Sequence, residues 1–254
     1  KNDMEGVKST FRYKTIASVA IMLIGILIFT IFGDNLIAAY LHTAEEGIDL
    51  ELTFGFAKQY MAIMLIGLIP FTVEQVYSGT LREGGTATVP MAAGIAAVLV
   101  NTMLNYLLIF GSFGFPKLGV EGAAIATVIS RFVQAGIVII WTHANSRKMA
   151  FIKGVYRSLK VPGKLAGRIT VKGLIPLTAN ECLWGAGVSM LVQLYSIRGI
   201  DVVAGLNIAN TVINLFNVMF IAFGSGVSVV IGQLLGAGEM EQAKKAAPRL
   251  IAFS

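Results

Sequence analysis

A glutamate, Glu181, lies near the middle of the apolar stretch at residues 171–197 and directly follows Asn180. At the centre of a bilayer a charged side chain costs roughly 2.5–3.5 kcal/mol on translocon-based scales. The carboxyl group must therefore be protonated, or it must face water or a cation. In the first case Glu181 could bind and release a proton, and in the second, beside Asn180, it could hold Na⁺. The alternative is a protonated glutamate that only joins neighbouring helices.

Asparagines follow one side of the next apolar stretch. They are spaced three, four and three residues apart, at Asn207, Asn210, Asn214 and Asn217. This spacing puts all four on one helical face, which must meet other helices or a hydrated cavity. An earlier stretch has a shorter pair, Asn101 and Asn105, one helical turn apart. Helix pairing and cavity lining both remain open for these asparagines.

Two more residues could serve such a site. Arg131 lies inside an apolar stretch, where we expect it to pair with a carboxylate, to line a cavity, or to lie closer to the membrane surface. Pro176 precedes Glu181 and removes a backbone donor, so it could act as a hinge or as a static kink. Glu74 and Gln75 are expected at the membrane interface, and Glu121 at the start of a helix, where its charge suits the helix dipole.

The composition makes a bilayer the expected surroundings of these residues. The chain has 254 residues, of which 56% are hydrophobic and 13% charged, and its mean hydropathy is +0.75. Soluble domains have about 25% charged residues. The net charge of +6 does not indicate nucleic acid binding, because the basic residues alternate by loop with acidic segments. No nucleophile–base set, metal cluster or cofactor motif is visible, so we predict no enzyme and no cofactor beyond a coupling Na⁺ or H⁺.

Six apolar segments can cross about 30 Å of hydrocarbon, which takes about 20 helical residues. They lie at residues 15–33, 56–79, 89–110, 120–141, 171–197 and 202–236. Runs such as "IMLIGILIFTIF" lack the alternation of barrel strands, so the sequence predicts an all-α integral membrane protein.

Lysine and arginine in the connections predict the orientation. Most of them lie in the N-terminal stretch, at Arg82, in the connection 142–172 and near the C-terminus. The intervening loops are mainly acidic and carry Asp34, Glu45, Glu46, Asp49, Glu51 and Asp201. We therefore expect a multi-pass protein of the cell membrane with both ends of this chain in the cytoplasm.

The basic connection also suggests how the chain divides. We predict the rest of an N-terminal lobe at residues 1–141, an inter-lobe linker at 142–170, and the start of a C-terminal lobe at 171–254. The last residues, "RLIAFS", begin another apolar run, so we expect a piece of a longer protein.

Four segments together resemble the multidrug and toxic compound extrusion (MATE) transporters. They are "LREGGTATVPM", "VNTMLNYLLIFGSFGFPKLGVEGAAIATVIS", "NECLWGAGVSM" and "VIGQLLGAGEMEQAKKA". The resemblance implies twelve helices in two repeated lobes, of which this chain holds about helices three to eight. "MEGVK" at residues 4–8 and "MEQAK" at residues 240–244 would then be equivalent segments of the two lobes. In some branches of the family an acid on the seventh helix takes part in cation coupling, and Glu181 lies on that helix.

The resemblance implies secondary active efflux of cationic or amphipathic compounds against Na⁺ or H⁺ by alternating access. The partners would be the lipid bilayer, drug-like substrates and the missing helices of the same polypeptide. A flippase for lipid-linked oligosaccharides is the nearest alternative, although it would favour several cations in its cavity for pyrophosphate. A membrane-embedded enzyme would need His, Asp and Glu clustered near one interface, and a channel or scaffold would not explain the repeated segments.

Overall fold

The computed structural model describes residues 4–41, 50–158, 160–196 and 200–253, and these residues form helices and connecting turns without a β-strand. The chain divides into two compact units, residues 2–161 and residues 162–254. The predicted all-α class is confirmed.

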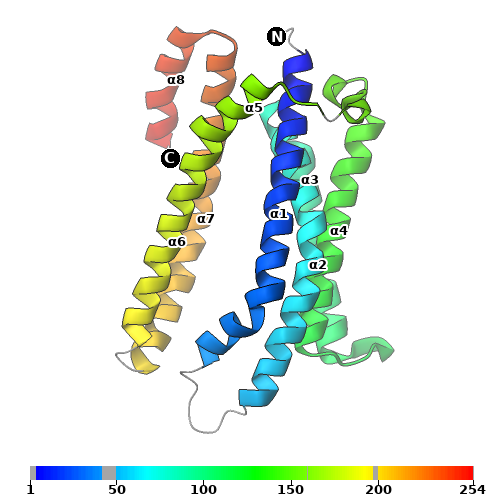
Figure 1. Ribbon diagram of the computed structural model, residues 1–254, viewed down its shortest axis with the longest axis vertical. Helices are drawn as coiled ribbons and strands as arrows, with labels where there is room; N and C mark the ends of the chain where they lie inside the picture. The colour runs from blue at the N-terminus through cyan, green and yellow to red at the C-terminus, as the bar shows by residue number, and fades with distance from the viewer. Residues whose placement is uncertain (1–3, 42–49, 159, 197–199, 254) are drawn as a thin grey trace. The chain divides into compact units, whose positions relative to one another are not determined.

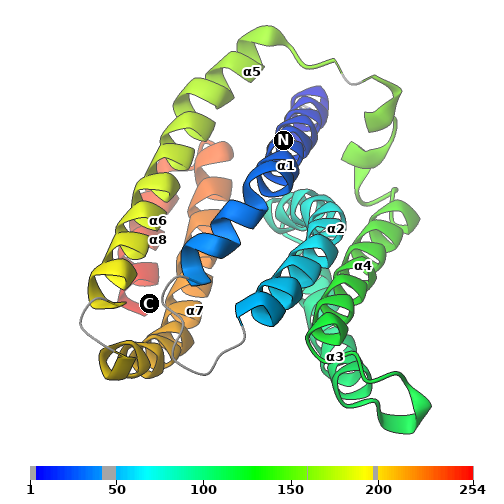
Figure 2. The ribbon, with the colours of Figure 1, turned by 60° about the horizontal axis from the view of Figure 1, so that its bottom comes forward.

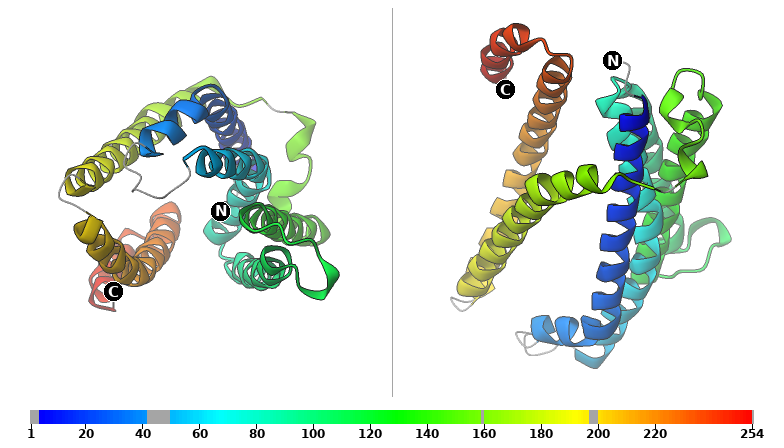
Figure 3. Two further views of the ribbon diagram at one scale, coloured as in Figure 1. Left: turned by 90° about the horizontal axis from the view of Figure 1, so that it is seen from below. Right: turned by 45° about the horizontal axis from the view of Figure 1, so that its top comes forward.

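Four long helices make up the first unit (Figure 1): α1 (Met4–Leu41), α2 (Leu50–Glu83), α3 (Thr88–Phe110) and α4 (Val120–Ala144). A short 3₁₀ turn, Ser112–Gly114, follows α3 and belongs to the Gly/Pro-rich turn before α4. α4 packs against both α2 and α3, and α1 packs against α2. Figure 3 (left) shows α4 beside both of its neighbours.

Small residues allow α4 to approach its neighbours closely. The buried face of α4 includes Gly122, Ala124, Ala126 and Ala135. A Cβ atom added at Gly122 would lie 2.7 Å from the carbonyl oxygen of Leu108 on α3. Helices in lipid associate mainly through close van der Waals packing, and small residues at the contact permit it.

A folded segment covers one end of this unit. Residues 145–157, here called the cap, contain two 3₁₀ turns, Ala150–Ile152 and Val155–Arg157. Phe151, Ile152 and Val155 are buried in one cluster with Phe11 of α1 and Tyr77 of α2, among others. Phe11 contacts the rings of Phe151 and Tyr77, with centroids 5.5 and 5.4 Å apart.

Hydrogen bonds also hold the cap. Arg12 Nε donates to the carbonyl oxygen of Val155 at 2.8 Å, and Arg12 Nη2 to that of Gly154 at 3.4 Å. The hydroxyl groups of Tyr77 and Tyr156 are in contact. The cap therefore belongs to the first unit, although its residues lie within the predicted linker at 142–170.

The second unit contains α5 (Gly163–Ile169), α6 (Ile175–Ser196), α7 (Ile200–Gly236) and α8 (Met240–Phe253). A π-helical turn, Thr170–Leu174, joins α5 to α6, and Figure 2 shows the two helices as one continuous coil. α6 packs against α7, and α7 against α8. Gly238, whose φ of +79° suits glycine, lies in the turn that reverses the chain between α7 and α8.

Among the described residues, five helical segments are long and apolar enough to cross a membrane. They are Glu5–Ala38, Leu50–Glu83, Thr88–Phe110, Val120–Ala144 and Ile208–Gly236. The predicted span at 171–197 corresponds to α6 and the preceding π turn. α6 has 22 residues, and Asn180 and Glu181 lower its hydropathy. Its crossing of the membrane stays a prediction.

Replacing Gly122 with alanine is expected to destabilise the first unit by about 1–3 kcal/mol, because the new methyl group meets backbone atoms of α3. Gly136→Ala is the matched control, since a Cβ there meets nothing within 4 Å on the same helix. Thermal unfolding of the purified protein in detergent measures both. Equal unfolding midpoints for the two variants would contradict the close α3–α4 contact.

Candidate functional site

The predicted site residues fall in both units. Asn101, Asn105 and Arg131 lie on α3 and α4 of the first unit, and the other candidates lie on α6 and α7 of the second. Each group is described within its own unit.

Asn101, Asn105 and Thr127 form a polar bridge between α3 and α4. Asn101 Nδ2 donates to Thr127 Oγ1 at 3.3 Å, and Asn105 Nδ2 donates to Asn101 Oδ1 at 3.1 Å. Thr127 Oγ1 in turn donates to the carbonyl oxygen of Ala123 at 2.9 Å. Asn105 Oδ1 is buried and has no partner among the described residues. The bridge therefore joins two helices and leaves one acceptor available.

Arg131 has partners that the sequence did not indicate. Its guanidinium carbon lies 5.1 Å from the centroid of the Phe71 ring on α2, in a cation–π arrangement. Arg131 Nη1 donates to Gln134 Oε1 at 3.4 Å. The salt bridges between described residues do not include Arg131. Aromatic stacking thus accounts for this cation within the first unit.

The candidates of the second unit lie on exposed helix surfaces. Asn180 and Glu181 are exposed on α6, and Asn210, Asn214 and Asn217 are exposed on α7. Asn207 belongs to α7, but its side chain lies outside what the structure describes. The described part of the chain has no group of three or more His, Cys, Asp or Glu that could hold a metal ion. The role of these residues stays a prediction.

Pro176 is the second residue of α6, and Ile175 alone separates it from the π-helical turn Thr170–Leu174. A proline has no N–H to donate to the preceding turn, and its ring crowds the carbonyl there. The wider π turn is a known way for a helix to accommodate such a break. The sequence indicated a hinge or kink at Pro176, and the structure places an irregular turn beside it.

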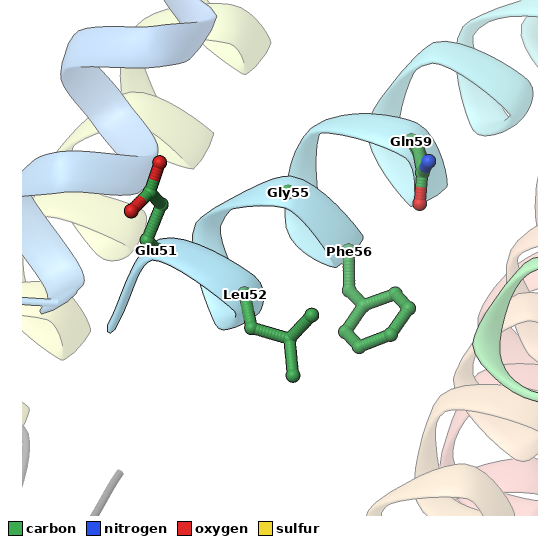
Figure 4. Close-up of a pocket in the computed structure, with 5 residues that line it drawn as sticks. All are labelled: Glu51, Leu52, Gly55, Phe56 and Gln59. Carbon is green, nitrogen blue, oxygen red and sulfur yellow. The ribbon is translucent and has the colours of Figure 1, made fainter. Parts of the chain in front are cut away.

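Surface depressions occur on α2 and between α7 and α8. One, of about 390 Å³, follows the first turns of α2 and is lined by Glu51, Leu52, Gly55, Phe56 and Gln59. Figure 4 shows the Glu51 carboxylate pointing away from Leu52 and Phe56. The other, of about 450 Å³, lies between α7 and α8 and is lined by Ala222, Phe223, Gly226, Val227, Val230 and Leu250. Neither depression includes a predicted site residue.

Glu74 is the buried acid that sequence reasoning missed. We expected it at the membrane interface, but only 1% of its surface is exposed. Ser78 Oγ donates to Glu74 Oε1 at 2.5 Å, and Glu74 Oε2 is buried with no partner among the described residues. Spacing could have indicated this, because Gly67, Pro70, Glu74 and Leu81 follow one helical face. Gln75, by contrast, is exposed.

The two similar five-residue segments have the same local structure. Met4 begins α1 and Met240 begins α8, each with a glutamate in the first turn. Lys8 pairs with Glu5 at 3.2 Å, and Lys244 pairs with Glu241 at 3.2 Å. Each unit therefore contains one such helix start with the same ion pair.

A helical chain with several segments able to cross a bilayer is a multi-pass membrane protein. The MatE family model matches residues 1–107 and 176–254. The chain therefore belongs to the MatE family, which is a family of transporters and not of enzymes.

Named relatives agree with this assignment. The probable multidrug resistance protein NorM of Thermotoga maritima is 33% identical over 189 residues, which cover 73% of this chain and 39% of that protein. The probable multidrug resistance protein YoeA of Bacillus subtilis is 27% identical over 74% of this chain and 41% of its own length. The NorM protein of Listeria monocytogenes is also 27% identical, over 75% of this chain and 41% of its own length. The chain thus spans about two fifths of the length of these relatives.

Replacing Thr127 with valine removes the hydroxyl group that accepts from Asn101 while keeping the side-chain shape. Interhelical hydrogen bonds in membrane proteins are worth about 0.6 kcal/mol on average and up to about 1.7 kcal/mol. We expect a loss of stability in that range, measured by unfolding in detergent. Thr142→Val is the control, because Thr142 donates only to Val138 of its own helix. An effect no larger than that of the control would argue against the α3–α4 bridge.

Proposed function

We propose that this chain is part of a secondary active multidrug exporter. It would exchange cationic or amphipathic compounds for Na⁺ or H⁺ across the cell membrane by alternating access. The observation that carries the proposal is the similarity to multidrug resistance proteins over about three quarters of the chain, at 73% and 74% for the first two relatives. Membership in the MatE family is in agreement with it.

The proposed mechanism centres on Glu181. A carboxyl group that binds either the coupling ion or the substrate makes the two compete for one site. Exchange without ATP follows if the coupling ion and the substrate favour different arrangements of the two lobes, each open to a different side of the membrane. Asn180 and the α7 asparagines Asn210, Asn214 and Asn217 would supply polar contacts in the cavity. Their exposure on α6 and α7 leaves them free of packing within the second unit.

Orientation is a second element of the proposal. Lys14 pairs with Glu83 at 2.5 Å, and Arg12 bonds to the cap, so three basic segments lie at one end of the first unit. Lys58 pairs with Asp34 at 2.8 Å nearer the opposite ends of α1 and α2. We assign the first end, with the N-terminal part of α1 and the turn after α2, to the cytoplasm.

The domain assignment is likewise proposed. The link between the lobes would lie within residues 142–170, and the remaining helices of both lobes would come from the same polypeptide. The boundary between the two compact units, after Val161, falls inside this link. Helices from the rest of the polypeptide would cover the exposed surfaces of α6 and α7.

A flippase for lipid-linked oligosaccharides is less well supported. Its pyrophosphate group would need several cations in the cavity, and Arg131 was the candidate. The guanidinium group of Arg131 stacks on Phe71 and donates to Gln134 instead. Efflux of organic cations requires no such cation, so we favour drug export.

Glu181→Gln in the full-length protein should abolish most ion-dependent efflux, because the amide can neither release a proton nor bind Na⁺ as a carboxylate. We expect at least about a tenfold loss, the equivalent of 1.4 kcal/mol. The measurement is ethidium efflux from energised cells or inverted vesicles. Glu241→Gln, at an exposed acid of the same unit, is the control.

Unchanged ion-dependent efflux in the Glu181→Gln variant would remove this carboxyl group from the mechanism. Absence of drug efflux by the wild-type protein, despite normal insertion in the membrane, would overturn the proposed function itself. Repeating the assay with Na⁺ and pH gradients applied separately identifies the coupling ion.

A further inference from the structure

The enclosed carboxyl group of Glu74 is not needed for the mechanism proposed above. We propose that Glu74 is a proton-binding site inside the four-helix unit, separate from Glu181, and that its proton holds α2 and α4 together. The proposal rests on the geometry of Glu74 and does not depend on drug transport.

The position of Glu74 on α2 faces the contact with α4. Gly67 lies about two helical turns before Glu74 on the same face of α2. A Cβ atom at Gly67 would meet Val128 of α4 at 3.0 Å. One turn after Glu74, the ring of Tyr77 lies 6.0 Å from that of His143 at the end of α4. Glu74 lies between these two contacts and is 1% exposed, so the helices themselves exclude water from it.

Only one of the two oxygen atoms of the Glu74 carboxyl group has a hydrogen-bond partner among the described residues. Ser78 Oγ donates to Oε1, whereas Oε2 is buried without a partner among the described residues. An ionised carboxylate in such a place is strongly unfavourable unless it is paired and fully hydrogen-bonded. A neutral carboxylic acid avoids most of this cost.

The ionisable groups on the elements around Glu74 do not neutralise it. Arg131 of α4 stacks on Phe71, and His143 of α4 contacts the carbonyl oxygen of Ile139 through Nδ1. On α1, Lys14 pairs with Glu83, and Arg12 donates to the cap. The phenol groups of Tyr77 of α2 and Tyr156 of the cap are paired with each other. The salt bridges between described residues include none of the basic residues of the cap, which are Arg147, Lys148, Lys153 and Arg157.

A proton is the neutralising group that fits. The salt bridges between described residues do not include Glu74, and no described acid, histidine or cysteine joins it in a cluster that could hold a metal ion. A proton taken up from water onto Oε2 converts the carboxylate to the acid without adding a heavy atom. Loss of that proton to water leaves a buried charge, which can be relieved only if water enters between α2 and α4.

Water entry at this level would affect the cap. Tyr77 lies on the turn after Glu74 and contacts both Phe11 and the hydroxyl group of Tyr156. Separation of α2 from α4 therefore loosens the cluster in which Phe151 and Val155 are buried. The charge of Glu74 is in this way connected to the docking of residues 145–157.

Infrared difference spectroscopy on the full-length protein in lipid tests the site directly. The wild-type protein should show the C=O band of a protonated carboxylic acid at neutral pH, and Glu74→Gln should remove that band. Glu51→Gln, at an exposed acid on the same helix, should leave the band in place. A wild-type spectrum without such a band at neutral pH, or a band that survives in Glu74→Gln, overturns the proposal.

Glu74→Gln keeps the size of the side chain and resembles the neutral acid, so we expect it to fold. If it does not, Ser78→Ala serves as the second variant, because it keeps Glu74 and removes the donor to Oε1. The frequency of the acid band should then shift, and an unshifted band counts against the proposal.

Hydrogen exchange of residues 145–157 measured across pH tests the connection to the cap. After correction for the intrinsic pH dependence, exchange in the wild-type protein should rise with pH. In Glu74→Gln it should stay constant with pH. The same rise in the variant would place the pH sensitivity elsewhere and contradict this part of the proposal. Because drug efflux is not measured, failure here is distinguishable from failure of the proposed function.

Discussion

The close approach of α4 to α2 and α3 is the constraint on which the first unit depends. Apolar side chains gain little by leaving lipid for one another, so helices in a bilayer need close backbone contact and polar pairs to associate. Gly122 brings α4 against the backbone of Leu108, and Gly67 brings α2 against Val128. The Asn101–Thr127 bridge and the enclosure of Glu74 both follow from this packing.

The polar groups in these helix contacts differ in where they find hydrogen-bond partners. Thr80 and Thr142 donate to carbonyl oxygens one turn earlier, so each hydroxyl group is satisfied within its own helix. Asn101 donates across the helix contact to Thr127 of α4, and Asn105 donates to Asn101 on its own helix, α3. Glu74 Oε2 and Asn105 Oδ1 remain as buried acceptors without a described partner. In a bilayer such acceptors are costly, and they mark the places where a proton, a cation or a water molecule would be stabilised.

Much of the fold could be predicted from hydropathy, but not the features that depend on which face a residue occupies. The apolar run 15–33 predicted a helix, whereas α1 begins at Met4, and Phe11 and Arg12 before that run contact the cap. The start of the helix at residue 120, with Glu121 in its first turn, was predicted correctly. Burial of Glu74 was missed, since a sequence window averages over all faces of α2. The contacts of Arg12 with the cap were also missed, because the residues that they join are separated by 142 or 143 positions in the sequence.

Docking of the cap shortens the part of the linker that can extend between the proposed lobes. The predicted linker has 29 residues if it runs from 142 to 170, yet the cap ends at Arg157 and α5 begins at Gly163. Residues 158–162 alone connect these two elements, and a fully extended chain of that length reaches only about 17 Å. Any larger displacement must bend the helix at the π turn beside Pro176 or release the cap from Arg12. A proton on Glu74 that stabilises the cap would therefore also restrict the motion between the lobes.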